Sequence, residues 1–513
     1  MLFNSYQFIF LFLPISLLGF YLLTKYNLKK TSVLWLVSAS LFFYSWWNPS
    51  YLLLIVFSIV FNYFLGELLH KRRNFYVLSF GVVGNLALLG YFKYGNFFVN
   101  NLNIIFEQDI ILQNIILPIA ISFFTFQQIA YLVDSYRGES KSTDFLNYCL
   151  FVTFFPQLIS GPIVHHKEML PQFNNMNLFN FKIRNLVIGI SIFSIGLFKK
   201  CIIADGIAVY STPVFDAAYQ GNTISFFEAW GGALAYSFQL YFDFSGYSEM
   251  ALGLARMFGI IIPINFFSPY KANSIIDFWR RWHITLSRFL RVYLYIPLGG
   301  NRKGTSRRFM NLFITMLLGG LWHGSSWNFV LWGAIHGIYL IINHAWNFMV
   351  KRLFGFKLVK SHFNFSRLLT FLAVVFAWVI FRAENLESAL IIYKGMLAMN
   401  GISVPHQLID QVTFVNNFFP FLDLKAEGLG SFGSPLGFIF ILILLLVVWF
   451  LPNTIEIMKN EVKYNNFSHN HNKRLFRLFT WKPNINWAIL LSITAALSIM
   501  SLNSVSEFLY FQF

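Results

Sequence analysis

The 513-residue chain is 57% hydrophobic and only 12% charged, whereas soluble domains carry about a quarter charged residues. This composition excludes an ordinary soluble globular protein and predicts a protein that crosses a membrane several times. The formal net charge is +17. In a membrane protein such an excess belongs to cytoplasmic loops, so we expect no nucleic-acid partner.

Apolar runs recur from one end of the chain to the other, and most approach the roughly 20 residues that a helix needs to span a bilayer. Two of them, 226–242 and 310–321, continue into polar, glycine-containing sequence. Irregular backbone at membrane depth is tolerated only where protein or a water-filled cavity shelters it. We therefore expect an all-α polytopic bundle of about 11 to 13 transmembrane helices with re-entrant and interfacial helices. The runs are 2–24, 31–47, 50–69, 75–92, 115–133, 145–164, 185–204, 226–242, 310–321, 326–346, 367–381, 436–451 and 484–501.

Short basic segments between the runs predict the orientation. KYNLKK (25–30), HKRR (70–73) and NRKGTSRR (301–308) are typical of cytoplasmic loops, whereas 100–114 has two acidic residues and no Lys or Arg. We therefore expect an external N-terminus whose first run is a retained span.

The chain shows no convincing internal repeat or linker, which predicts a single membrane domain over 1–513. Its polar motifs gather in a core at 239–346, and its longest polar stretches, 401–435 and 457–483, are predicted to be extramembrane loops. The second of these loops is basic and aromatic, so we expect it against the cytoplasmic lipid headgroups.

Metal and disulfide chemistry have little support in the sequence. The two cysteines, Cys149 and Cys201, lie in apolar surroundings and predict neither a disulfide framework nor a cysteine metal site. His469 and His471 are predicted to be solvated, with a weak preference for metal left open. We expect no bound metal and no bound cofactor.

The stretch DFWRRWHITLSRFLRVYLYIPLGGNR (277–302) predicts an amphipathic helix. At about 100° per residue, one face carries four arginines, and His283 lies at its flank. Two interpretations stay open: an interfacial helix that binds headgroups, or a clamp that holds the phosphates of a nucleotide-like or phosphopantetheine donor, since Arg binds phosphate in bidentate fashion. The four arginines are Arg280, Arg281, Arg288 and Arg291.

The stretch MLLGGLWHGSSW (316–327) places His323 within sequence apolar enough for a bilayer. An ionisable side chain at membrane depth is costly and indicates a functional site; the alternative is a core histidine satisfied by one backbone carbonyl. Gly319, Gly320 and Gly324 favour function, because glycine permits the close approach that a thin acyl chain passing His323 would need.

Few residue types are left to carry out the chemistry. The sequence contains no GxSxG, HExxH or P-loop motif. A histidine can still act as general base on a hydroxyl, and acyl transfer from a thioester needs little more than that and donors for the oxyanion. His336, beside Gly333 and Gly337, is predicted to support the site from a helix-packing face.

Together with QLYFDFSGYSEMALGLARMFGI (239–260), these two motifs closely resemble the membrane-bound O-acyltransferase family. The match is best with its alginate O-acetylation branch, which includes relatives acting on peptidoglycan and other exopolysaccharides, and it covers essentially the whole chain. The chain is also similar to the D-alanyl transfer protein of teichoic acid modification. The resemblance implies helices around a central tunnel. A thioester donor, acetyl-CoA or an acyl carrier protein, would enter it from the cytoplasm, and a hydroxyl acceptor or secreted partner protein would approach from outside.

The resemblance also implies roles for single residues. His323 of the WHG motif and His283 of the FWRRWH motif correspond to the family histidines. Asp243 and Tyr247 fall in a family motif one helical turn apart, with a buried hydrogen-bonded pair as an open alternative. Glu249 stands where members commonly carry Asp. We expect supporting roles for Trp322, Asn328 and His336.

The C-terminal FLYFQF (508–513) has two interpretations. It is typical of the aromatic belt at a membrane interface. In the D-alanine pathway a similar motif on a very small partner protein is implicated in passing the acyl group outward, and Tyr510 would be the matching residue.

The sequence thus predicts an O-acyltransferase, specifically an O-acetyltransferase, that serves an extracytoplasmic polysaccharide: alginate-like, another exopolysaccharide, or peptidoglycan. Its expected partners are the thioester donor, an extracytoplasmic acyltransferase or acceptor protein, the polysaccharide and membrane lipids. A polysaccharide or lipid transporter is the alternative, but its paired half-repeats are not evident. A scaffold subunit would not require two histidines in polar, glycine-flanked settings.

Overall fold

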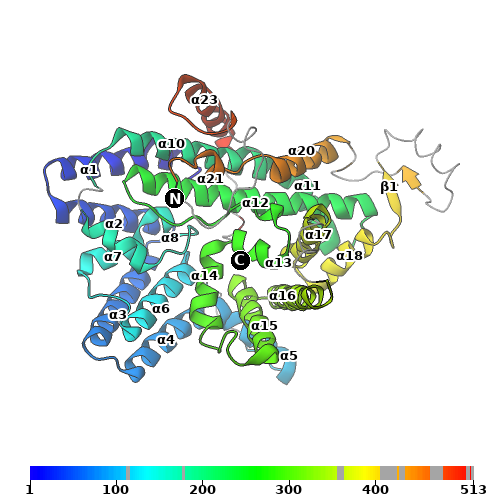
Figure 1. Ribbon diagram of the computed structural model, residues 1–513, viewed down its shortest axis with the longest axis horizontal. Coiled ribbons are helices and arrows are strands. Elements are labelled where there is room, and N and C mark those ends of the chain that lie inside the picture. Colours follow the sequence, from blue (N-terminus) through cyan, green and yellow to red (C-terminus); the bar gives the residue numbers. More distant parts are fainter. Residues whose placement is uncertain are drawn as a thin grey trace. The chain divides into compact units, whose positions relative to one another are not determined.

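The computed structural model describes residues 1–110, 116–175, 179–354, 363–404, 424–426, 432, 434–462, 478–503 and 509. These residues are overwhelmingly helical (Figure 1), which confirms the predicted all-α class. The chain divides into two compact units. The first comprises Met1–Phe198, Ser245–Asn265 and Lys482–Phe513, and the second Lys199–Phe244 and Phe266–Trp481.

Among the described residues, six helical stretches are long and apolar enough to cross a membrane, and two shorter apolar helices accompany them. The protein is therefore an integral, multi-pass membrane protein. Other predicted runs form shorter helices, such as α2 (Lys29–Ser45) and α6 (Ile121–Arg137), each of 17 residues. The total of 11 to 13 spans stays a prediction. The six stretches are Gln7–Lys25, Tyr51–Lys71, Phe75–Phe106, Ile183–Tyr219, Trp327–Leu353 and Phe365–Arg382.

The first unit contains an antiparallel helical group that buries a pair of amides. Asn62 on α3 and Asn85 on α4 each donate to the other's side-chain oxygen, at 3.1 and 2.6 Å, so two costly polar groups satisfy one another in an apolar interface. The elements of this unit are η1 (Gln7–Phe12), α1 (Leu13–Lys25), α2, α3 (Tyr51–Lys71), α4 (Phe75–Leu89), η2 (Gly90–Tyr94), α5 (Gly95–Phe106), α6, α7 (Phe145–Thr153), α8 (Phe155–Leu158), α9 (His166–Asn174), α10 (Ile183–Phe198), the end of α12 (Phe226–Met257), α23 (Ile485–Met500) and η11 (Ser501–Asn503).

The second unit carries most of the predicted motif core. It also holds a short parallel strand pair, in which Ile402 is in register with Leu424, inside the stretch expected to be a loop. Its elements are η4 (Lys199–Ala204), α11 (Asp205–Tyr219), the start of α12, η5 (Pro269–Lys271), α13 (Ile275–Arg281), α14 (Ile284–Leu290), η6 (Arg291–Tyr295), α15 (Gly304–His323), α16 (Trp327–Phe354), α17 (Phe363–Arg382), α18 (Leu386–Met396), β1 (Ile402–Val404), β2 (Leu424–Ala426), α20 (Leu436–Phe450) and α21 (Thr454–Ile457).

The prediction of one continuous amphipathic helix over 277–302 is wrong. The chain forms α13, α14 and η6 instead, and it breaks where His283 adopts a left-handed backbone (φ 42°, ψ 55°). That conformation is costly for any residue with a Cβ. It accompanies burial of Trp282, whose ring lies 5.6 Å from that of Phe278 and 5.0 Å from that of Trp378. The charge pattern gave no sign of this aromatic packing.

Helices α15 and α16 touch backbone to backbone. A Cβ on Gly320 would lie 2.2 Å from the carbonyl oxygen of Phe329, and one on Gly333 would lie 2.4 Å from that of Met316. The expectation that Gly320 makes room for an acyl chain is therefore wrong, since α16 already fills that space. The helix-packing role predicted for Gly333 is confirmed.

Candidate active site

His323 ends α15 inside a cage of aromatic rings. Its ring centroid lies 5.0 Å from that of Trp322, 5.1 Å from that of Trp332 and 5.2 Å from that of Phe381. The side chain is 5% exposed. Three rings from α15, α16 and α17 thus hold the imidazole in one orientation and exclude bulk water from it.

His283 belongs to the same cluster. It is fully buried, and its ring contacts Phe244 at 4.9 Å and Trp322 at 6.1 Å between centroids. Trp322 therefore bridges the two histidines that the sequence singled out.

His336 extends the cluster on α16. Its Nδ1 accepts a hydrogen bond from Nε1 of Trp279 at 3.3 Å, and its ring lies 4.7 Å from that of Trp332. Since Trp332 also contacts His323, His336 holds one wall of the cage. The supporting role expected for His336 stays a prediction.

Asn328 has a structural contact. Its Nδ2 donates to the carbonyl oxygen of Ala383 at 2.7 Å, which ties the start of α16 to the end of α17. Those are the two helices that supply Trp332 and Phe381 to the cage, so Asn328 fixes how they meet.

Asp243 forms a buried ion pair that the sequence did not reveal. Nζ of Lys200 lies 2.7 Å from Oδ1 of Asp243 and 2.8 Å from Oδ1 of Asp205. The side chains of Lys200 and Asp243 are each 2% exposed. Tyr247, in the other unit, is buried and stacks on Phe3 at 4.8 Å.

The four arginines separate into two groups. Arg281 pairs with Asp277 at 2.9 Å and lies over the ring of Phe267, so its guanidinium serves the local fold. Three arginines remain exposed, and the donor-binding prediction depends on them: Arg280, Arg288 and Arg291.

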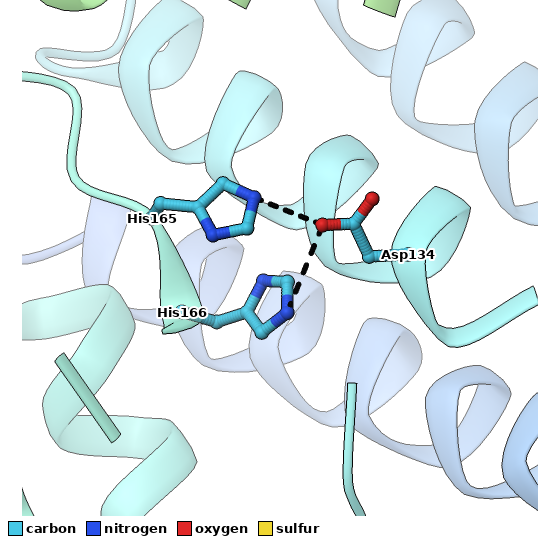
Figure 2. A group of neighbouring side chains, drawn as sticks. All are labelled: Asp134, His165 and His166. Atoms are coloured by element: carbon cyan, nitrogen blue, oxygen red, sulfur yellow. Dashed lines mark ion pairs between the residues drawn. The ribbon is translucent and has the colours of Figure 1, made fainter. Parts of the chain in front are cut away.

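Some predicted positions lie outside the described residues, namely Tyr510, His469 and His471. A cluster in the first unit was not predicted from the sequence: Asp134 lies against His165 and His166 (Figure 2). The adjacent pair of histidines was a visible signal, but nothing in the sequence placed a carboxylate beside it.

The chain matches the model of the membrane-bound O-acyltransferase family over residues 7–384. That stretch includes both caged histidines and the ion pair of Asp243. The chain belongs to the membrane-bound O-acyltransferase family. It is therefore an O-acyltransferase, as the motifs predicted.

Several members of this family are similar to the chain over most of its length. A peptidoglycan O-acetyltransferase of Helicobacter pylori is 47% identical over 450 residues, which cover 81% of this chain and 83% of the relative. A probable alginate O-acetylase of Pseudomonas aeruginosa is 44% identical over 409 residues, or 78% and 75% of the two chains. A teichoic acid D-alanyltransferase of Streptococcus thermophilus is 29% identical over 244 residues, or 46% and 58%.

Proposed function

We propose that the protein is an O-acetyltransferase of a bacterial cytoplasmic membrane that uses a cytoplasmic acetyl thioester to modify an extracytoplasmic polysaccharide. The relatives named for peptidoglycan and alginate O-acetylation support this substrate class. In the reaction, a hydroxyl oxygen attacks the thioester carbonyl, the C–O ester bond forms and the C–S bond breaks. The proton of the hydroxyl ends on the departing thiolate.

His323 is the group that moves this proton. A histidine accepts a proton from a hydroxyl and returns it to a leaving group near neutral pH, and the ring cage holds His323 in a fixed orientation for both steps. His283, one tryptophan away, aligns the thioester. The cage that joins these two histidines is the observation that carries the proposal.

The direction of α15 supports a cytoplasmic donor. This 20-residue helix starts within the basic segment 301–308 and ends at His323, so His323 lies about 28 Å along the helix axis from that segment. The α14–η6 segment runs antiparallel beside it: Leu290 lies against Gly319, and Gly300 accepts a hydrogen bond from Asn311. Arg291 follows Leu290 in this direction and therefore lies on the predicted cytoplasmic side of His323.

Replacing Arg288 and Arg291 together by glutamine is expected to raise KM for the donor by about tenfold or more and to leave kcat within a few-fold. A phosphate clamp distant from the reacting carbonyl contributes equally to ground-state and transition-state binding, and charge-assisted hydrogen bonds are worth about 1.5–3 kcal/mol each. Initial rates at varied donor concentration measure both constants.

The matched control removes two exposed arginines of the basic segment, Arg302 and Arg307, by the same substitution. The control should leave KM for the donor unchanged. An unchanged KM in the Arg288→Gln, Arg291→Gln protein would instead make these arginines a headgroup anchor, and equal effects in both proteins would indicate a response to net charge alone.

Acyl transfer is expected to be vectorial. In sealed vesicles with the protein in one orientation and an acceptor on the opposite face, labelled donor supplied on the side of the 301–308 segment should acylate that acceptor. Donor supplied on the other face should not. Radiolabel on the isolated acceptor measures transfer, and protease access to the segment establishes the orientation.

The vesicle experiment separates direction from chemistry. Label that appears only on the donor's own face would rule out transmembrane transfer and leave the O-acyltransferase assignment intact. An entrapped soluble dye controls for leakage, since donor that crosses through broken vesicles would imitate the expected result.

A further inference from the structure

A cluster of three metal-ligating side chains lies in the first unit and uses no residue assigned to acyl transfer. Asp134 is in the last turn of α6, His165 caps α9 and His166 begins it. The Oδ2 atom of Asp134 lies 2.9 Å from Nε2 of His165 and 3.8 Å from Nε2 of His166. Figure 2 shows both rings directed at the same carboxylate.

His166 is the unusual member of the cluster. It is 2% exposed, and neither of its ring nitrogens has a hydrogen-bond partner among the described residues. A buried imidazole in this state does not recover the free energy of its desolvation. A neutral imidazole, in which one ring nitrogen offers a lone pair, is the form that binds a metal ion.

We propose that Asp134, His165 and His166 bind a divalent transition-metal ion, and that Zn²⁺ fits the site best. Zinc takes imidazole and carboxylate ligands at about 2.0–2.2 Å in tetrahedral geometry, which sets ligand atoms roughly 3.3 Å apart. The separations of 2.9 and 3.8 Å from Asp134 Oδ2 bracket that value, and all three ligand atoms lie within 4.8 Å of one another. Three protein ligands leave the fourth position to water.

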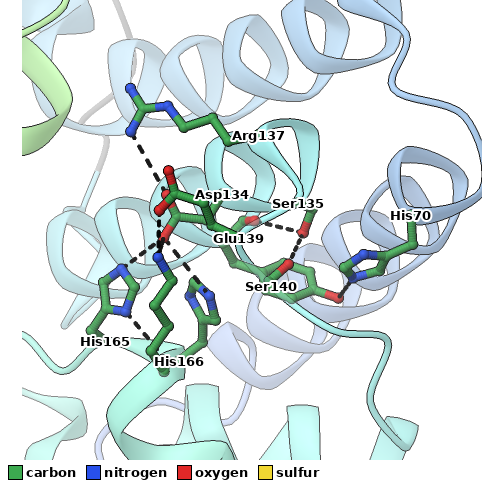
Figure 3. Close-up of polar contacts among 10 residues, drawn as sticks. His70, Asp134, Ser135, Arg137, Glu139, Ser140, His165 and His166 are labelled. Atoms are coloured by element: carbon green, nitrogen blue, oxygen red, sulfur yellow. Dashed lines mark hydrogen bonds and ion pairs between the residues drawn. The ribbon is translucent and has the colours of Figure 1, made fainter.

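Two cationic side chains approach Asp134, and Figure 3 labels one of them, Arg137. Arg137 approaches the other oxygen, Oδ1, of Asp134 at 3.8 Å. Lys167 approaches Oδ2 at 3.5 Å, but it is 42% exposed and already holds Glu139 at 2.5 Å. An incoming ion therefore displaces Lys167 toward Glu139 and leaves Arg137 in place.

His165 changes its hydrogen bonding when it binds. Its Nδ1 accepts the backbone N–H of Lys167 at 3.2 Å and so caps α9, which places the ring proton on Nε2 beside Asp134. Metal binding at Nε2 moves this proton to Nδ1. The ion therefore removes the hydrogen bond by which His165 caps α9, and its coordination bonds join α6 to α9.

The site lies close to the basic segment 70–73. Tyr131, one turn before Asp134, has its hydroxyl 3.5 Å from Nε2 of His70, and the guanidinium of Arg73 lies against Gly138. Since this segment is predicted to be cytoplasmic, the ion would come from the cytoplasm.

The test measures metal binding by the full chain in detergent, stripped with a chelator and carrying His469→Ala and His471→Ala to remove two competing histidines. Titration with Co²⁺ should give a visible absorption band that saturates at one ion per chain, and Zn²⁺ should displace it. Asp134→Asn and His166→Gln should each weaken Co²⁺ binding at least tenfold. His70→Gln, which removes a neighbouring histidine outside the proposed ligand set, should not.

Thermal unfolding supplies the second measurement. The parent is the full chain that carries only His469→Ala and His471→Ala. Zn²⁺ should raise the apparent Tm of the parent and of its His70→Gln variant. It should not raise that of the Asp134→Asn variant, in which an amide of the same shape replaces the carboxylate. Absence of a saturable band in the parent, or equal binding by parent and Asp134→Asn, would overturn the proposal. Because neither measurement uses acyl transfer, the metal site and the proposed function can fail independently.

Discussion

Replacing His323 by glutamine or alanine is expected to lower kcat for acyl transfer by about 10²–10⁴-fold, the usual contribution of a general base. Glutamine keeps a polar side chain within the cage formed by Trp322, Trp332 and Phe381, but it cannot accept a proton. Release of free thiol from the donor, measured with purified protein in the presence of acceptor, gives the rate.

His336→Gln is the matched control for His323→Gln. Glutamine at position 336 can still accept the hydrogen bond that Trp279 donates, so we expect kcat within a few-fold of that of the unaltered protein. If the His323→Ala protein keeps most of its activity, His323 is not the general base. Equal losses at both positions would show that the cluster responds to packing and not to loss of a base.

Lys200→Met is expected to be the most destabilising of the substitutions considered. It leaves the carboxylate of Asp243 buried without the ammonium that lies 2.7 Å from it, and breaking a buried pair from one side costs about 3–5 kcal/mol. The apparent Tm in detergent should fall clearly below that of the unaltered protein, and helix content measured by circular dichroism should be lost at lower temperature.

The double variant Lys200→Met, Asp243→Leu tests the cause. Apolar replacement of both partners is often neutral or stabilising, so most of the lost stability should return. If Lys200→Met unfolds at the temperature of the unaltered protein, the pair contributes nothing to stability. If the double variant is no more stable than the single one, the damage comes from lost packing of the lysine stem.

The fold class could be predicted, and His323 and His283 could be selected as candidates, because both inferences rest on local sequence. Bilayer spans leave long apolar runs, and His323 stood out because an ionisable group is costly there. Its partner His283 was found through a motif. The rings of Trp332 and Phe381 could not be assigned to the cage, since their contacts join helices whose order in space no local pattern specifies.

The errors have the same origin. The spacing of the arginines predicted one helix over 277–302, but the chain breaks there and Trp282 is buried against other aromatic rings. Arg281 forms an ion pair with Asp277 and does not belong to the exposed arginine group. The sequence correctly indicated a close approach at Gly320, but it does not show whether a ligand or another helix makes that approach. Lys200 and Asp134 were missed because each meets its partners only in the folded chain. Asp243 lies beside Lys200, and two histidines of α9 lie beside Asp134.

The backbone contact between Gly320 and Gly333 also governs how the enzyme can move. No side chains separate the two helices at this contact, so moving them apart would lose van der Waals contact along their length. We therefore expect α15 and α16 to move as one rigid unit. Widening the space around His323 during turnover then falls to rotation of the surrounding rings. Because these rings are themselves buried, their rotation requires the side-chain packing around them to loosen, but it does not require α15 and α16 to separate.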